Sequence, residues 1–276
     1  MKEQLDKILK DNNCDSLNYE RALNVFNGYD FTPVMIEINK NAELFRVRTN
    51  DKKSFYKKIS EISNPPINQV KCFSRANRPG QSMFYCSKFK DISLLELLDS
   101  FIEKNEVGKS QYMTYSKWKT TNDYKLLLIY NPLTQERTGF NYEFYTFFVN
   151  YLEKYSESDR KKIKDYYSII AKYFQTPTKL NDNSIYYITS AFANFAKIKC
   201  DYDGLIYPSV QAHQAGYNIA FCDSILEKKG IVPIEVWMEQ LKKTDIQKAE
   251  FQKGIINGKI NDKRINWEKN PAANIV

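Results

Sequence analysis

Three residues whose chemistry suits a nucleotide follow one another at nearly even intervals. Arg75 precedes Tyr85 by ten residues, and Tyr85 precedes Glu96 by eleven. A guanidinium can grip phosphate oxygens with a fork of two bonds. An aromatic face stacks on a flat ring, and a carboxylate accepts hydrogen bonds from ribose hydroxyls. Taken singly, the same residues are also typical of a solvated arginine, a core tyrosine and the wet side of a helix.

A second polar patch lies far along the chain and contains Asp203-Gly204, Tyr207-Pro208-Ser209 and Asn218. Ser209 follows a Tyr-Pro pair at the end of an expected strand. The only histidine, His213, is four residues away, and no aspartate is placed to orient it. A Ser-His-Asp hydrolase is therefore poorly supported, and we expect Ser209 to contact a ligand rather than to attack it. Asn218 would bond a carboxamide or a ribose.

These short motifs, in this order, resemble the RES family, which is named for its Arg, Glu and Ser. Many members are toxins of bacterial toxin–antitoxin pairs. The resemblance covers about residues 44–102 and 183–225, and its first part rests on Leu44–Arg48, Arg75–Asn77 with Gly80, Phe84-Tyr85 and Leu94–Glu96. Two departures stand out: the gap between Glu96 and Ser209 is long, and no tryptophan follows Arg75 as it does in many members.

The resemblance implies a fold related to ADP-ribosyltransferases, action on NAD and a protein antitoxin as partner. It places Arg75, Tyr85, Glu96 and Ser209 in the catalytic site. It also favours Arg46 and Asn218 as NAD-binding residues at the edge of one shared cleft. Arg46 and Arg48 lie on the same face of an expected strand because side chains alternate with period two. The pattern alone therefore leaves the choice between these two arginines open.

Cleavage of the nicotinamide–ribose bond of NAD passes through an oxocarbenium-like state, which a carboxylate stabilises. Glu96 would do this, Arg75 would hold the pyrophosphate and Tyr85 would face the nicotinamide. Water, phosphate or a protein would accept the ADP-ribosyl group, making the enzyme a glycohydrolase, a phosphorolase or an ADP-ribosyltransferase. The residues leave these acceptors open.

Composition adds one alternative and one exclusion. Lys and Arg number 41 against 33 acidic residues, for a net charge of +8, which favours anionic partners. The alternative is a basic nucleic-acid-binding protein without catalysis, but no familiar nucleic-acid-binding motif supports it. The five cysteines form no CxxC pair, so we expect no metal site.

The N-terminus is charged and lacks a secretory apolar region. No apolar run approaches the roughly 18–20 residues that a membrane span requires. Together with cysteines that show no disulfide pattern, these features predict a cytoplasmic protein that does not enter a membrane.

The periodicity predicts a single α+β domain over residues 1–276. We expect helices within 1–28, 92–103 and 185–197, and strands near 34–38, 44–48, 81–86, 205–207, 217–221 and 232–237, the last followed by a charged helix. The tail after Gly254 would form a hairpin or be partly disordered. An aromatic-rich block at 104–182 is expected to be a helical insertion around a buried strand at 125–130. Its clearest amphipathic helix covers 163–174.

Overall fold

The structure is a computed structural model that describes residues 1–11, 15–50, 55–134, 140–178, 182–212 and 216–268. It divides into two compact units, each assembled from three separate stretches of chain. Unit 1 contains residues 1–38, 66–83 and 124–222, and unit 2 contains residues 39–65, 84–123 and 223–276. Helices and strands of both orientations occur along the chain, which confirms the α+β class. The single domain over residues 1–276 stays a prediction beside this division.

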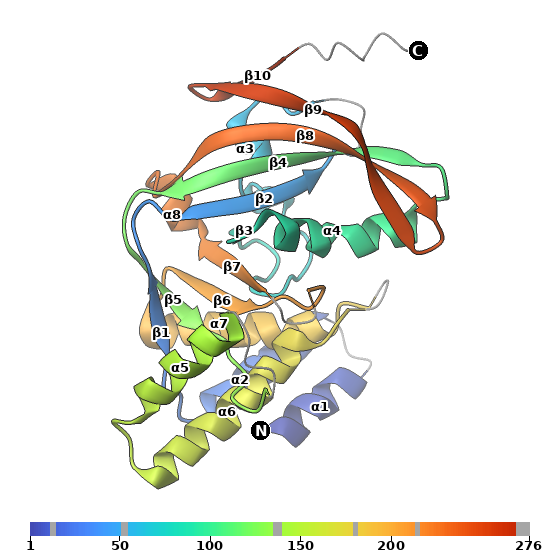
Figure 1. The fold of residues 1–276 in the computed structure, drawn as a ribbon. Helices are drawn as coiled ribbons and strands as arrows, with labels where there is room; N and C mark the ends of the chain where they lie inside the picture. Colours follow the sequence, from blue (N-terminus) through green and yellow to red (C-terminus); the bar gives the residue numbers. More distant parts are fainter. Residues whose placement is uncertain (12–14, 51–54, 135–139, 179–181, 213–215, 269–276) are drawn as a thin grey trace. The chain divides into compact units, whose positions relative to one another are not determined.

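Unit 1 is built on a mixed sheet. Its strands lie in the order β1 (Met35–Ile38), β5 (Tyr124–Leu128), β6 (Gly204–Pro208) and β7 (Tyr217–Cys222) (Figure 1). The β5–β6 pair is parallel, whereas the other two pairs are antiparallel. Parallel neighbours require a long crossover, and the chain supplies it as three helices between β5 and β6. All five residues of β6 are buried, as expected for an inner strand covered on both faces.

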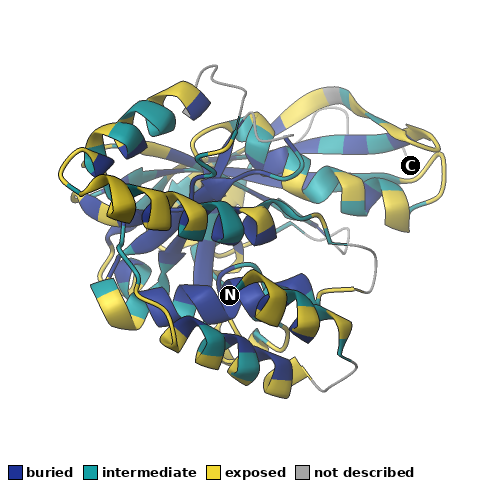
Figure 2. Cartoon of the chain, turned by 90° about the horizontal axis from the view of Figure 1, so that it is seen from below, coloured by how far each residue is buried: buried dark blue, intermediate teal, exposed yellow. Residues whose placement is uncertain are grey.

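Helices of unit 1 cover this sheet with an aromatic core. They are α1 (Lys2–Lys10), α2 (Asp15–Asn27), α5 (Phe140–Leu152), α6 (Glu157–Gln175) and α7 (Ile185–Cys200). The stripe expected at 163–174 is confirmed, because Ile163, Tyr167, Ile170 and Phe174 of α6 are buried. Phe26 of α2 packs edge-on against a phenylalanine ring of α7. Figure 2 shows buried and exposed residues side by side along the helices, as expected for amphipathic helices that bury one face. The short 3₁₀ turn Ile67–Gln69 also belongs to this unit.

Unit 2 is an antiparallel layer with one long helix against it. The strands lie in the order β3 (Met83–Ser87), β2 (Glu43–Thr49), β4 (Ser110–Thr120), β8 (Ile231–Asp245), β9 (Lys248–Asn261) and β10 (Arg264–Trp267) (Figure 1). Helix α4 (Lys90–Lys104) packs on this layer through a buried cluster formed by Val47, Leu94, Phe101, Met113, Tyr115 and Leu241. Two short helices, α3 (Ile59–Ile62) and α8 (Asp223–Glu227), complete the unit.

The block at 104–182 is helical only in its second half, which corrects the predicted helical insertion. It starts with β4, which lies between β2 and β8, and continues with β5, the expected buried strand. The missed strand β4 is buried at four successive positions, 113–116. Burial on both faces removes the alternation of polar and apolar residues that marks a half-buried strand.

The charged helix expected after residue 237 is also wrong, because β8 continues as a strand to Asp245. Residues 238–245 include Glu, Gln, Leu and Lys, which favour helices in isolation. Here they pair with β9, with Leu241 opposite Phe251 and Lys243 opposite Ala249. Tertiary pairing overrides the local preference. The hairpin expected in the tail is confirmed by the antiparallel β9–β10 pair.

Candidate functional site

Arg75 sits at the tip of a tight turn in unit 1. The turn is closed by a hydrogen bond from the Ser74 amide to the Asn77 carbonyl, with N and O 2.9 Å apart. Gly80 then adopts a φ of +75°, a left-handed conformation that glycine accepts without steric cost. Its amide donates to the Val70 carbonyl at 2.9 Å. The Arg-Ala-Asn and Gly pieces of the sequence motif therefore build the loop that presents Arg75.

The Arg75 side chain caps the C-terminal end of helix α6. Its Nη1 atom donates to the carbonyl oxygens of Tyr173, Phe174 and Thr176, at 3.3, 2.9 and 3.2 Å. The guanidinium also lies 5.1 Å from the ring centre of Tyr186. Helix C-termini leave carbonyl groups without intrahelical partners and carry partial negative charge. A cation placed there stabilises the helix end, so Arg75 has a structural function that the sequence pattern did not reveal.

Arg46 and Arg48 lie on β2 of unit 2, and both are held by backbone carbonyls. Arg46 donates from Nη1 to the carbonyl of Tyr85 at 2.5 Å and from Nε to that of Ile62 at 3.2 Å. Arg48 donates from Nη1 to the carbonyl of Glu61 at 2.7 Å. Burial, and next the charge of Arg48, lower the pKa of the Arg46 guanidinium to about 10, so it remains charged at neutral pH. Both arginines donate to backbone carbonyls of residues 61–63. Which of the two would bind NAD therefore stays open.

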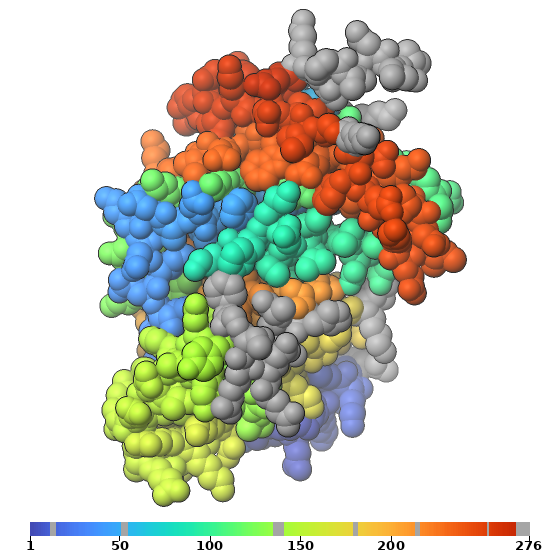
Figure 3. Space-filling model, viewed as in Figure 1, coloured from blue at the N-terminus to red at the C-terminus, as the bar shows by residue number. Residues whose placement is uncertain are grey.

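Tyr85 and Glu96 are presented by neighbouring elements of unit 2. Tyr85 is the one half-buried residue of β3, whose other four residues are buried. Glu96 lies on the exposed side of α4, while Leu94 and Phe101 on the opposite side enter the buried cluster. The outer surface of α4 lies open beside the β8–β9 strands (Figure 3). The expectation that Glu96 lies off the apolar arc of its helix is confirmed.

Ser209 and Asn218 belong to adjacent strand ends of unit 1. The Ser209 amide donates to the Gly216 carbonyl at 2.8 Å, and its Oγ accepts from the Ala212 amide at 3.2 Å. Ser209 is fully buried. Its hydroxyl oxygen therefore helps to close the turn after β6. Asn218 is buried on β7, opposite Tyr207 of β6. His213 lies outside the described residues.

The Asp203-Gly204 piece of the motif has a structural explanation. A Cβ added at Gly204 would come within 2.7 Å of the Ala220 carbonyl oxygen and 3.1 Å of the Phe221 Cα. Only glycine allows β6 and β7 to approach this closely. Asp203 is locked beside it, because its Oδ2 accepts from the Lys125 amide at 2.8 Å. These two residues fix the strands that carry Ser209 and Asn218.

The six predicted residues thus fall into two groups. Unit 2 brings Arg46 into contact with the backbone of Tyr85 and carries Glu96 on α4. Unit 1 carries Arg75, Asn218 on β7, and Ser209, which directly follows β6, the strand paired with β7. The single cleft that would join both groups stays a prediction.

The described ranges lack two kinds of feature. They contain no cluster of three or more His, Cys, Asp or Glu side chains suited to a metal ion. None of their helices has the length and apolar character needed to cross a membrane.

Comparisons with known proteins give a similarity in structure but none in sequence. No protein-family model matches the chain, and no curated protein matches its sequence. A solved structure that is similar to it is described as the toxin–antitoxin complex MbcT–MbcA of M. tuberculosis. The alignment covers 72% of this chain and 85% of that one, with 9% identity and a TM-score of 0.36.

Proposed function

We propose that this protein consumes NAD by breaking the bond between nicotinamide and ribose. The observation that carries the proposal is the ordered set Arg75, Tyr85 and Glu96, at offsets of ten and eleven residues. The surroundings of Glu96 support it, because α4 holds this carboxylate on its solvent-facing side while the opposite side is anchored in the buried cluster. The buried cluster anchors the helix, and the helix carries Glu96 on its exposed side.

The proposed reaction needs little covalent chemistry from the protein. The bond from C1′ to the ring nitrogen breaks, and its electron pair leaves with nicotinamide, which becomes neutral. Positive charge then develops at C1′, and Glu96 stabilises it. An acceptor oxygen attacks C1′ and loses its proton. Arg75 would hold the pyrophosphate through its remaining nitrogens, Tyr85 would face the nicotinamide, and Ser209, Asn218 and Arg46 would contact the ligand.

The acceptor defines the subclass of the enzyme. Water makes it an NAD glycohydrolase, phosphate makes it a phosphorolase, and a protein side chain makes it an ADP-ribosyltransferase. Each reaction depletes NAD in the cytoplasm, so we propose that the protein inhibits growth and that an antitoxin protein restrains it. NAD is a substrate here, and the reaction as written requires no metal.

The decisive experiment is NAD consumption by the purified chain, with identification of the products. Glu96→Gln should lower turnover by roughly 10²–10³, the size of effect seen when one preorganised electrostatic group is lost. Glu103→Gln is a matched control, because Glu103 is also an exposed carboxylate of α4 but lies two turns further along. This control should cleave NAD at the wild-type rate.

Two results would contradict the proposal. One is intact NAD after long incubation with folded wild-type protein, in the presence and absence of phosphate and of a cell extract as a source of acceptor proteins. The other is wild-type turnover in a folded Glu96→Gln variant, which would remove this carboxylate from the mechanism. Circular dichroism of each variant shows whether the fold is kept.

A further inference from the structure

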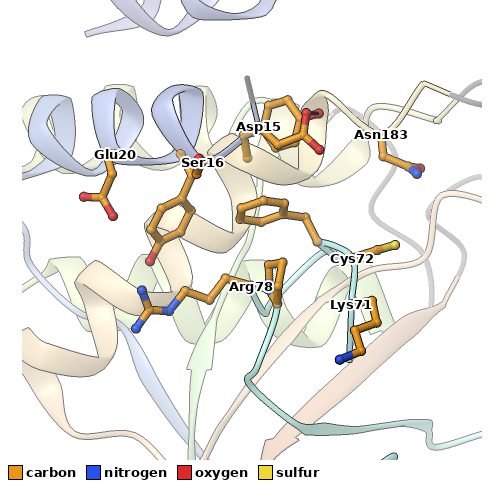
Figure 4. A pocket seen from close by; sticks show the side chains of 11 residues that line it. Asp15, Ser16, Glu20, Lys71, Cys72, Arg78 and Asn183 are labelled. Atoms are coloured by element: carbon orange, nitrogen blue, oxygen red, sulfur yellow. Dashed lines mark hydrogen bonds between the residues drawn. The ribbon is translucent and has the colours of Figure 1, made fainter. Parts of the chain in front are cut away.

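An open groove of about 790 Å³ lies entirely within unit 1, on the loop that carries Arg75. Its walls come from the start of α2, from residues 71–79 and from the first turn of α7. Figure 4 shows the lining side chains. The volume falls within the range of roughly 300–1,000 Å³ that is typical of small-molecule sites.

Three aromatic rings form a continuous wall of this groove. The ring centres of Tyr19 and Phe73 are 5.4 Å apart, and those of Phe73 and Tyr187 are 5.2 Å apart. Tyr19 is 3% exposed, so its ring is firmly held, whereas Phe73 and Tyr187 are half-buried and accessible from the groove. Accessible rings on a rigid support offer a stacking surface for a flat ligand ring.

Charged groups of opposite sign line the two sides. Lys71 and Arg78 come from the loop and are exposed, and the Arg78 guanidinium lies 5.8 Å from the ring centre of Tyr19. The opposite side holds Asp15 and Glu20 of α2. The Tyr187 hydroxyl donates to Asp15 Oδ1 at 2.5 Å, which fixes that carboxylate at the groove edge. In Figure 4 Asp15 and Glu20 lie in the upper part of the view, and Arg78 and Lys71 lie in the lower part.

We propose that this groove binds a mononucleotide. Lys71 and Arg78 would take the phosphate, the rings of Phe73 and Tyr187 would stack on the base, and the carboxylates of α2 would accept bonds from the ribose hydroxyls. A free phosphate would use only the basic side, and an apolar ligand would use only the rings. A nucleotide uses all three kinds of group.

None of the six residues proposed to act on NAD lines this groove. It shares its loop with Arg75, and Tyr186, which contacts Arg75, is the neighbour of Tyr187 in α7. A nucleotide in the groove would therefore lie beside the residues that hold Arg75 in place. The proposal does not rest on NAD cleavage.

Calorimetric titration of the full chain with AMP tests the site. AMP should bind, and the double variant Lys71→Ala/Arg78→Ala should weaken its binding at least tenfold. Lys161→Gln, which removes an exposed lysine of α6 outside the groove, should change the dissociation constant less than twofold. Adenosine and inorganic phosphate should each bind more weakly than AMP.

The exposed thiol of Cys72, which lines the groove, gives an independent readout. Saturating AMP should slow its alkylation at least fivefold, measured by mass spectrometry of the peptide that contains it. The proposal is overturned if AMP does not bind the wild type, if the double variant binds it as tightly, or if phosphate binds as well as AMP. None of these measurements involves turnover, so they can fail while NAD cleavage holds, and the reverse is also true.

Discussion

Arg75 combines a structural and a proposed ligand-binding role in one guanidinium. Nη1 is committed to three carbonyl oxygens at the end of α6. A lysine placed there keeps the charge but cannot direct several bonds at once. We expect Arg75→Lys to lower the free energy of unfolding by about 1 kcal/mol, in line with a partly exposed cation at a helix C-terminus. The same variant should raise KM for NAD.

Two separate measurements distinguish these roles. Urea denaturation reports the loss of the cap, and initial rates at varied NAD report the loss of ligand contacts. Arg78→Lys is the control for stability, because Arg78 lies in the same loop and caps no helix among the described residues. It should change stability by less than about 0.5 kcal/mol. A variant Arg75→Lys that loses stability with an unchanged KM would leave the residue a cap only.

At the scale of the elements, the close approach of β6 and β7 makes a sharp prediction. Gly204→Ala places a methyl group 2.7 Å from the Ala220 carbonyl oxygen, closer than side-chain carbons come to such atoms. The strands must shift to admit it, and overpacking of this kind costs about 1–3 kcal/mol. Because Asn218 lies on β7 and Ser209 directly follows β6, NAD cleavage should also fall.

A second glycine of unit 1 provides the comparison for this variant. Gly28 follows α2, and a Cβ there would meet its nearest neighbour, the Val25 carbonyl, at 3.4 Å. Gly28→Ala should therefore keep or slightly increase stability, since alanine restricts the unfolded chain. Urea midpoints of the two variants check the prediction, and equal midpoints would contradict the steric reason given for Gly204.

The sequence predicts a helix or strand well where one face of it is exposed to water and the other is buried. The amphipathic stripe of α6 and the apolar arc of α4 follow from the 3.6-residue period, because one side of each helix faces water. Strand β4 has no regular alternation of buried and exposed residues, because it lies between β2 and β8. The second half of β8 contains residues that favour helices, and it forms a strand because β9 pairs with it. The local sequence shows neither the burial of β4 nor the pairing of β8.

The candidate site shows the same division. Residue types and spacing predict which chemistry Arg75 and Glu96 can support, and the exposure of Glu96 follows from helical periodicity. The hydrogen bonds of Arg75 to the end of α6 cannot be predicted in this way. Their acceptors are backbone carbonyls about 100 residues away, and since every residue has a carbonyl, no residue type marks them. The groove was missed for a related reason: Tyr19, Phe73 and Tyr187 are remote in sequence and meet only in the folded unit.

At the scale of the whole molecule, the last segment of unit 2 should be indispensable. Strand β4 pairs with β8 along its full length, from Ser110 opposite Lys242 to Thr120 opposite Ile231. A chain of residues 1–222 keeps every stretch of unit 1 but lacks β8, β9 and β10. Without them Met113 and Tyr115 lose Leu241 from their cluster.

We expect the shortened chain to bind a hydrophobic dye and to lose NAD cleavage completely. Amide hydrogen exchange should show lost protection in 43–49 and 110–120, while 204–208 and 217–222 remain protected at a reduced level. Full-length protein taken through the same preparation is the control. Wild-type protection over β2 and β4 in the shortened chain would contradict the dependence of unit 2 on its last segment.

The alternation of the chain between the two units has a genetic consequence. A stop codon anywhere before residue 223 removes sequence from both units at once, because each unit draws on stretches that continue past residue 123. A chain that ends at residue 222 retains every stretch of unit 1, whereas any chain that ends earlier leaves both units incomplete. If the proposed activity inhibits growth, cells selected for survival should carry nonsense and frameshift mutations scattered along the gene instead of gathered near the codons for Arg75 or Glu96. The positions of these mutations in the sequenced survivors would show which stretches of the chain the activity requires, and no purified protein is needed.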